Sequence, residues 1–109
     1  MIIYPITEEF IFHESGRFPR GWQPLVRSVL EQFSKDLNST DVFIYSKFGH
    51  LDIRFARHLC PAGYLWEIAK NIEIESAHTC ERCGSKDATL RTSATWWYTW
   101  CTECFAAKS

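Results

Sequence analysis

The chain has 109 residues, 46% of them hydrophobic, and twelve Lys and Arg against thirteen Asp and Glu give a formal net charge of −1. This composition excludes a disordered chain, and no apolar run approaches the roughly 18 residues of a membrane-spanning helix. The balanced charge disfavours a dedicated duplex-DNA-binding protein, which usually presents a broad basic face. We therefore expect one globular unit in the cytoplasm, with no membrane association.

The first part of the chain contains one strongly periodic segment. Residues 1–20 have no clear periodicity, although the apolar run Phe10–Phe12 predicts a short strand. Over about residues 20–37, apolar side chains recur at the i, i+3, i+4, i+7 spacing of an amphipathic helix. They are Trp22, Leu25, Val26, Val29, Leu30, Phe33 and Leu37. This helix is the best supported element of the chain.

A β-hairpin over about residues 42–57 and a second helix over about 61–77 are predicted next. The second strand of the hairpin alternates apolar and polar residues, so one of its faces should be buried. Residues 48–50 are expected to form the turn. Pro61 suits the first position of the second helix, because its missing N–H costs nothing there. Residues 1–77 therefore predict an α+β fold, with two helices packed on a short antiparallel sheet.

Four cysteines near the C-terminus form two C-x2-C pairs separated by seventeen residues. They are Cys80 with Cys83, and Cys101 with Cys104. This spacing is typical of a structural zinc site, in which four thiolates surround one tetrahedral ion. The residues between the pairs suffice for one β-hairpin, which would bring a second knuckle back to the first. We predict that residues 78–109 form a four-cysteine zinc ribbon (zinc-knuckle) module docked on residues 1–77, and that its closed ligand shell is structural.

Other cysteine chemistries are less well supported by the sequence. The opening residues Met1–Pro5 lack the features of a secretory signal, which disfavours disulfides in an oxidising compartment. Iron held as in rubredoxin-like sites is an alternative that four sulfurs leave open. A redox C-x-x-C would be a single pair beside a βαβ pattern, which the sequence lacks. The fifth cysteine, Cys60, is predicted to be a buried thiol, and His78 is expected to neighbour the site without binding the metal.

The chain is rich in aromatic residues, with five Trp, eight Phe and four Tyr. Such side chains build cores and also form the hot spots of binding surfaces. Residues 95–100 predict a strand that places Trp96, Tyr98 and Trp100 on one face. We expect this triplet to attach the ribbon to the helices. A second hypothesis is that Trp97, on the opposite face, stays exposed as an anchor for a partner.

Several short motifs occur in a particular order over residues 21–105. They are Gly21-Trp22-x-x-Leu25, Lys47-Phe48-Gly49-x-Leu51, Ser76 before Cys80-Glu81-x-Cys83-Gly84, and Trp100-Cys101-x-x-Cys104. The order resembles a family of small, uncharacterised phage and bacterial proteins that combine a GWxxL helix, a KFGxL hairpin and terminal C-x2-C pairs. The chain departs from the family's charge pattern at Tyr45, Ser46 and Asp52. The resemblance implies a bacterial or phage origin and a cytoplasmic, metal-bound domain, but no function.

Three classes of function are compatible with these patterns. The first is a non-catalytic protein-binding module, such as an accessory, inhibitor or immunity-type protein, because the charge is balanced and aromatic residues are in surplus. The alternative is a nucleic-acid-binding zinc ribbon, more suited to single strands than to duplex, in which Trp97 stacks on a base while basic side chains contact phosphates. Those basic residues are Arg82, Lys86 and Arg91. An enzyme is the least supported class, since only His13 with Glu14, His50 with Asp52 and His58 with Cys60 suggest catalysis.

Overall fold

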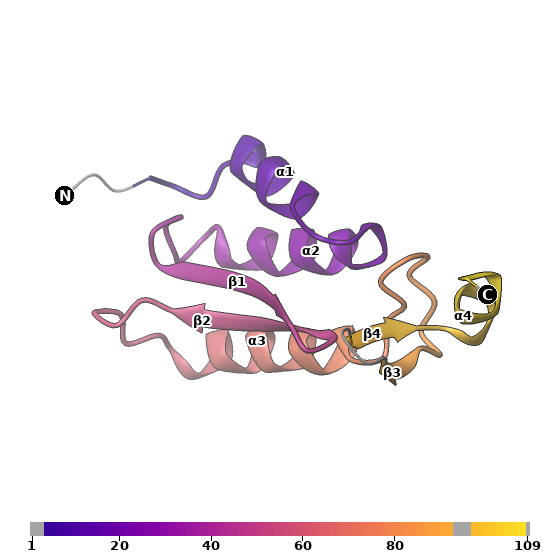
Figure 1. The fold of residues 1–109 in the computed structure, drawn as a ribbon. Helices are drawn as coiled ribbons and strands as arrows, with labels where there is room; N and C mark the ends of the chain where they lie inside the picture. Colours follow the sequence, from indigo (N-terminus) through magenta and orange to yellow (C-terminus); the bar gives the residue numbers. More distant parts are fainter. Residues whose placement is uncertain (1–3, 93–96, 109) are drawn as a thin grey trace.

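A computed structural model describes residues 4–92 and 97–108 of the chain (Figure 1). Over these residues the fold is α+β, as the sequence predicts, with helices and two small antiparallel sheets. The elements are α1 (Glu8–Gly16), the 3-10 helix η1 (Arg20–Trp22), α2 (Gln23–Phe33), β1 (Val42–Lys47), β2 (His50–Phe55), α3 (Gly63–Ser76), β3 (Thr89–Thr92), β4 (Trp97–Trp100) and α4 (Thr102–Lys108). No helix in this described part is both long and apolar enough to cross a membrane.

The strand predicted at Phe10–Phe12 is wrong, because these residues lie inside α1. Thr7 is the N-cap of this helix, and its side-chain oxygen accepts a hydrogen bond from the Phe10 N–H at 3.2 Å. Such a cap satisfies one of the donors that a helix start leaves free. Only Ile11 and Ser15 are buried in α1. The helix therefore lacks the long apolar stripe by which sequence periodicity is detected.

The two predicted helices exist with shorter bounds. The first begins with η1, continues as α2 and ends at Phe33, although Leu37 beyond its end is still buried. The second begins at Gly63 with Ala62 as N-cap, so Pro61 lies before the helix and the prediction that it opens the helix is wrong. The main hydrophobic core joins apolar residues of α1, α2, α3 and both strands of the first sheet.

The predicted hairpin is confirmed as β1 and β2, which pair in register from Val42 with Phe55 to Lys47 with His50. The turn is made by Phe48 and Gly49, both with positive φ, at 51° and 82°. A tight two-residue turn whose twist matches that of the hairpin strands requires positive φ at both residues. His50 therefore belongs to β2, not to the turn.

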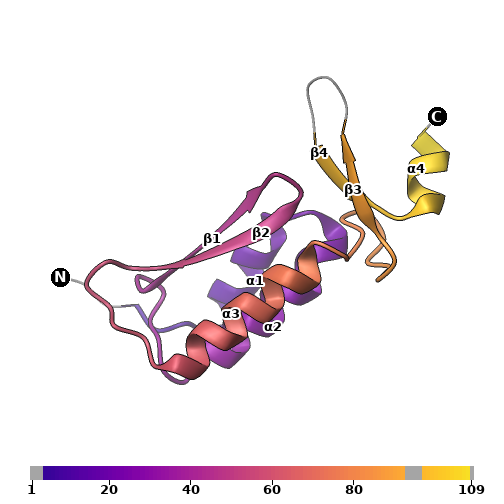
Figure 2. The same cartoon turned by 90° about the horizontal axis from the view of Figure 1, so that it is seen from below.

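The two faces of this sheet differ. Val42, Ile44, Leu51 and Ile53 are buried in the main core, while Phe43 and Tyr45 are exposed on the other face. Figures 1 and 2 show α3 running alongside β2, and the β3–β4 hairpin with α4 at the end of the molecule near the β1–β2 turn. One face of the first sheet therefore packs on helices and the other stays open.

Side chains of α3 bind the backbone along the outer edge of β2. The Leu51 N–H donates to the Ser76 hydroxyl oxygen at 2.8 Å, and the Ile53 N–H donates to a Glu73 carboxylate oxygen at 2.7 Å. The Ser76 hydroxyl in turn donates to the Glu73 carbonyl oxygen at 2.6 Å. The helix thereby satisfies donors that a third strand would otherwise have to pair.

Replacing Ser76 by alanine should therefore destabilise the fold. Ser76 and Leu51 are fully buried, so Ser76→Ala leaves the Leu51 N–H without a partner in a place that water does not reach. We expect a loss of about 1–3 kcal/mol in the free energy of unfolding, measured by urea denaturation. Ser34→Ala at the exposed end of α2 is the control, with an expected change within about 0.5 kcal/mol. Equal effects of the two substitutions would contradict the role given to Ser76.

Candidate metal centre

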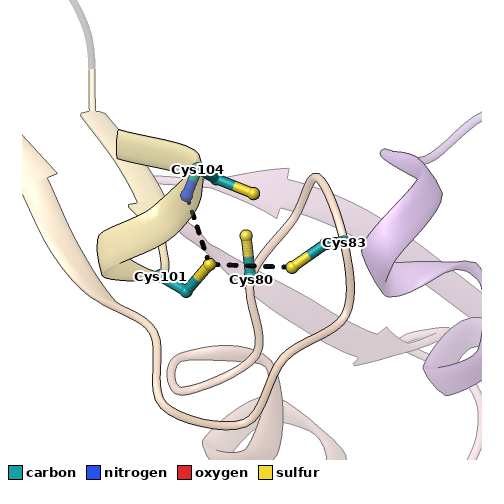
Figure 3. Close-up of side chains that lie close together, drawn as sticks. All are labelled: Cys80, Cys83, Cys101 and Cys104. Atoms are coloured by element: carbon teal, nitrogen blue, oxygen red, sulfur yellow. Dashed lines mark hydrogen bonds between the residues drawn. The ribbon is translucent and has the colours of Figure 1, made fainter. Parts of the chain in front are cut away.

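The four paired cysteines meet at one point of the structure (Figure 3). Their Sγ atoms all lie within 4.8 Å of one another, and those of Cys83 and Cys101 are 3.6 Å apart. A tetrahedral ion with metal–sulfur bonds of about 2.3 Å requires sulfur–sulfur edges of roughly 3.8 Å. The cluster thus has the composition and the size to hold one metal ion.

The first pair of cysteines forms a tight knuckle between α3 and β3. The Gly84 N–H donates to the Cys80 carbonyl oxygen at 2.8 Å, and the Cys80 N–H donates to the Ser85 carbonyl oxygen at 2.7 Å. Gly84 has φ of 85°, a conformation that residues with a Cβ rarely adopt. Glycine directly after Cys83 therefore suits the tight turn of this knuckle.

The second pair lies at the start of a helix. Cys101 directly precedes α4, and Cys104 lies in its first turn. The Cys104 N–H donates to the Cys101 Sγ at 3.5 Å, while the Phe105 N–H donates to the Cys101 carbonyl oxygen at 3.0 Å. The second knuckle expected from the sequence is therefore replaced by a helix start. Sequence patterns missed α4 because seven residues are too few to show a periodic stripe.

The thiols of Cys80 and Cys104 differ in how readily they ionise. Burial raises the pKa of Cys80, but hydrogen bonds from the backbone of Cys101, Cys83 and Arg82 and from the Cys83 side chain outweigh it and lower this pKa to about 6. Burial and hydrogen bonds from the neighbouring thiols raise the pKa of Cys104 to about 12. One thiolate therefore forms easily, whereas a full set of four needs a cation to balance its charge.

Little apolar packing surrounds this centre. The second core cluster contains Cys80 and Cys101 themselves, with Ala88 and Trp100 and the partly buried Tyr98 and Cys104. The Tyr98 and Trp100 rings stack with centroids 4.4 Å apart. A core of this size cannot offset the conformational entropy of about thirty residues, so the sulfur centre must supply much of the stability.

Gly21 and Trp22 hold the knuckle against the helices. The Gly21 N–H donates to the Glu81 carbonyl oxygen at 2.8 Å, and the buried Trp22 indole N–H donates to the Thr79 carbonyl oxygen at 2.9 Å. A Cβ at Gly21 would overlap the Cys80 carbonyl oxygen and lie 2.7 Å from the Gly84 nitrogen. The backbone of η1 and the knuckle therefore touch, which only glycine permits at this position.

A second set of contacts joins the β1–β2 turn to β4. The buried Thr99 hydroxyl donates to the Gly49 carbonyl oxygen, and the Thr99 N–H donates to a Glu81 carboxylate oxygen at 3.1 Å. Burial raises the pKa of Glu81, opposed by hydrogen bonds from the Thr99 backbone and the Trp100 side chain. A Cβ at Gly49 would lie 2.6 Å from Leu90 Cδ1, so the turn and the second hairpin approach closely.

The basic residues singled out from the sequence all have partners within the chain. The Arg82 guanidinium lies 5.3 Å from the centroid of the Trp100 ring, and the Arg91 guanidinium lies 4.6 Å from that of Phe105. Lys86 Nζ forms a 2.8 Å ion pair with a Glu75 carboxylate oxygen. These side chains therefore contribute to the packing and electrostatics of the module itself.

Trp97, in contrast, is 49% exposed. Its ring packs on that of Phe48 at the β1–β2 turn, with centroids 5.7 Å apart, and Phe48 is itself 62% exposed. Tyr98 and Trp100 pack in the second core cluster with the cysteines and not in the main core that holds α2 and α3, so the prediction that they attach the ribbon to the helices is not supported. Thr99 and Trp97, on the opposite face of β4, contact the β1–β2 turn instead. Trp96, which the sequence analysis places beside Tyr98 and Trp100, lies outside the described residues.

The remaining candidate residues lie apart from the sulfur cluster. Cys60 is an exposed free thiol in the loop before α3, so the prediction that it is buried is wrong. Asp52, considered with His50 as a catalytic pair, binds Arg54 through hydrogen bonds of 3.0 and 3.1 Å. His58 Nε2 lies 3.5 Å from an Asp41 carboxylate oxygen.

Comparisons of this chain with protein-family models, with curated proteins and with solved structures find no match. The resemblance to small phage and bacterial proteins therefore stays a prediction.

Proposed function

We propose that this chain is a zinc-stabilised, non-catalytic protein-binding module that acts in a reducing compartment such as the bacterial cytoplasm. Zinc is favoured because four thiolates from two C-x2-C pairs form a closed tetrahedral shell with no position for water or substrate. Such a site stabilises structure and performs no chemistry of its own.

The observation that carries the proposal is an exposed aromatic face, which we define as Phe43, Tyr45, Phe48 and Trp97. Their side chains are between 44% and 62% exposed. Phe43 and Tyr45 lie on the open face of the first sheet, Phe48 forms its turn, and Trp97 packs on Phe48 from β4. Tryptophan and tyrosine anchors in such clusters are typical of protein interfaces.

The charges near the aromatic face also favour a protein partner. Arg54 pairs with Asp52 beside Tyr45, so part of the local positive charge is already neutralised. Arg82, Lys86 and Arg91 of the cysteine module are engaged within the chain, which reduces the positive charge available to a phosphate backbone. We therefore place a single-stranded nucleic acid second among the candidate partners.

Partner capture separates these two functions. The tagged protein is incubated with host lysate, half of it treated with nuclease, and washed at low and high salt. A single protein retained in both halves at high salt would support the proposal, since phosphate contacts weaken steeply with salt. Material lost on nuclease treatment would instead identify a nucleic acid as the partner.

Replacing Trp97 should weaken binding to the captured partner much more than it affects folding. Trp97→Ala is expected to raise the dissociation constant at least about 30-fold, the effect of removing one interface hot spot. Calorimetric titration with the purified partner measures this change. Trp66→Ala on α3 is a matched control, because Trp66 is 54% exposed and stacks edge-on against Phe55 far from the cysteine module. An unchanged affinity in Trp97→Ala would exclude the aromatic face as the docking surface.

A further inference from the structure

The two outer edges of the first sheet differ in the hydrogen bonds that the rest of the chain makes to them. Ser76 and Glu73 of α3 bind the backbone of β2 at Leu51 and Ile53, which closes that edge. The edge of β1 lies on the opposite side of the sheet from this edge, where residues of α1 and β1 line a common groove. The two edges therefore need separate consideration as sites for strand pairing.

The pairing with β2 establishes which groups of β1 point outward. The Asp41 carbonyl oxygen accepts a hydrogen bond from the Ala56 N–H at 2.8 Å, so the odd-numbered residues direct their backbone groups towards β2. In an antiparallel pair this direction alternates, so Val42, Ile44 and Ser46 direct theirs to the outer edge. Within residues 4–92 and 97–108, no other backbone or side chain bonds these outward groups.

The surroundings of this edge leave room for another strand. A groove of about 300 Å³ runs beside it, lined by Phe10, Leu30, Val42 and Ile44 together with the Glu14–Arg17 ion pair. Natural edge strands are usually protected by charges, proline or a bulge. In β1 the only charged residue is Lys47 at its end.

We propose that the β1 edge pairs with the β1 edge of a second copy of this chain, forming a continuous antiparallel sheet across a two-fold axis at Ile44. In this register Ile44 faces Ile44 of the second copy and Val42 faces Ser46 of the second copy, so every outward N–H and C=O meets its complement. Any shift of one residue would place inward-pointing groups opposite outward ones and lose these bonds.

Side chains favour the same register. On the open face, Phe43 comes opposite Tyr45 of the second copy, an aromatic cross-strand pair. Lys47 comes opposite Asp41 of the second copy, whose carboxylate already binds the Asn38 N–H and His58 of its own chain, so no like charges oppose this register. Because both copies use the same edge in this two-fold contact, assembly stops at a dimer. This contact uses Phe43 and Tyr45 of the aromatic face but not Phe48 or Trp97, so Trp97→Ala tests the other partner without altering the dimer.

The test is the mass of the purified, metal-loaded protein by sedimentation from micromolar to millimolar concentration, together with amide hydrogen exchange by NMR. We expect a monomer–dimer equilibrium in which exchange at Ile44 and Ser46 slows as concentration rises, while Leu51 and Ile53 are protected at every concentration. A monomer throughout, with exchange at Ile44 independent of concentration, would overturn the proposal.

Ser46→Pro tests the backbone contact directly. The Ser46 N–H makes no bond to β2, so proline removes only the outward donor and keeps the hairpin. By symmetry the dimer loses two hydrogen bonds, which should weaken it about 30-fold or more. Ser46→Ala keeps the N–H and should dimerise like the unaltered chain. Equal dimerisation of both variants would also overturn the proposal.

Discussion

Removing the metal is expected to unfold the C-terminal module while the main core stays folded. The second core cluster has only Ala88, Trp100 and Tyr98 besides the cysteines, so the ligand shell carries most of its stability. Structural zinc in small modules contributes about 10–16 kcal/mol of apparent binding free energy at neutral pH. The main core contains no ligand of the metal and buries residues from three helices and two strands.

Chelation followed by NMR measures this outcome for each element. Amide signals of β3, β4 and α4 should collapse to unfolded positions, those of α2 and α3 should stay dispersed, and Zn²⁺ should restore the first set. Cys104→Ser should reproduce the loss, whereas Cys60→Ser should not, because Cys60 is exposed and outside the cluster. An unchanged melting curve after verified metal removal would show that the module does not depend on the ion.

Gly21→Ala should be among the most damaging substitutions outside the cysteines. The added Cβ would overlap the Cys80 carbonyl oxygen and press on the Gly84 nitrogen and the Glu81 carbonyl carbon at 2.7 and 2.8 Å. These are backbone atoms of a knuckle held by its own hydrogen-bonded turn, so they cannot rotate away as a side chain would. We expect a loss of about 3 kcal/mol or more in the free energy of unfolding.

Gly63→Ala is the control for Gly21→Ala, because its Cβ would meet nothing within 4 Å at the start of α3. It should leave stability unchanged or raise it by up to about 1 kcal/mol. Co²⁺ absorption separates loss of docking from loss of metal, since all four cysteines remain in Gly21→Ala. A tetrahedral thiolate spectrum with lowered stability is expected. Wild-type stability in this variant would mean that η1 and the knuckle are not in contact.

The GWxxL and KFGxL motifs of residues 21–25 and 47–51 make contacts that stabilise the fold. Gly21 and Trp22 contact the knuckle, Gly49 lets the β1–β2 turn approach β4, and Leu51 is buried against Ser76. These motifs therefore account for how the metal module is held. Tyr45 and Asp52 face each other across the hairpin.

The sequence alone predicted what depends on local spacing. The stripe from Trp22 to Phe33 predicted the main helix, and alternation in residues 42–57 predicted the hairpin, because one buried face imposes its period on neighbouring residues. The cysteine spacing likewise predicted which sulfurs come together, since two short turns and one hairpin suffice to join them. Helices α1 and α4 escaped detection because each is short and buries few side chains.

Only the tertiary structure determined which distant elements contact one another and through which atoms. Trp22 binds Thr79 across 57 positions and Thr99 binds Gly49 across 50, and no local pattern encodes contacts at such separations. The same applies to Arg82, Lys86 and Arg91, whose contacts with Trp100, Glu75 and Phe105 no local pattern predicts. Local periodicity reports which face of an element is apolar, whereas the packing of distant segments determines which polar groups and aromatic rings stay free to bind another molecule.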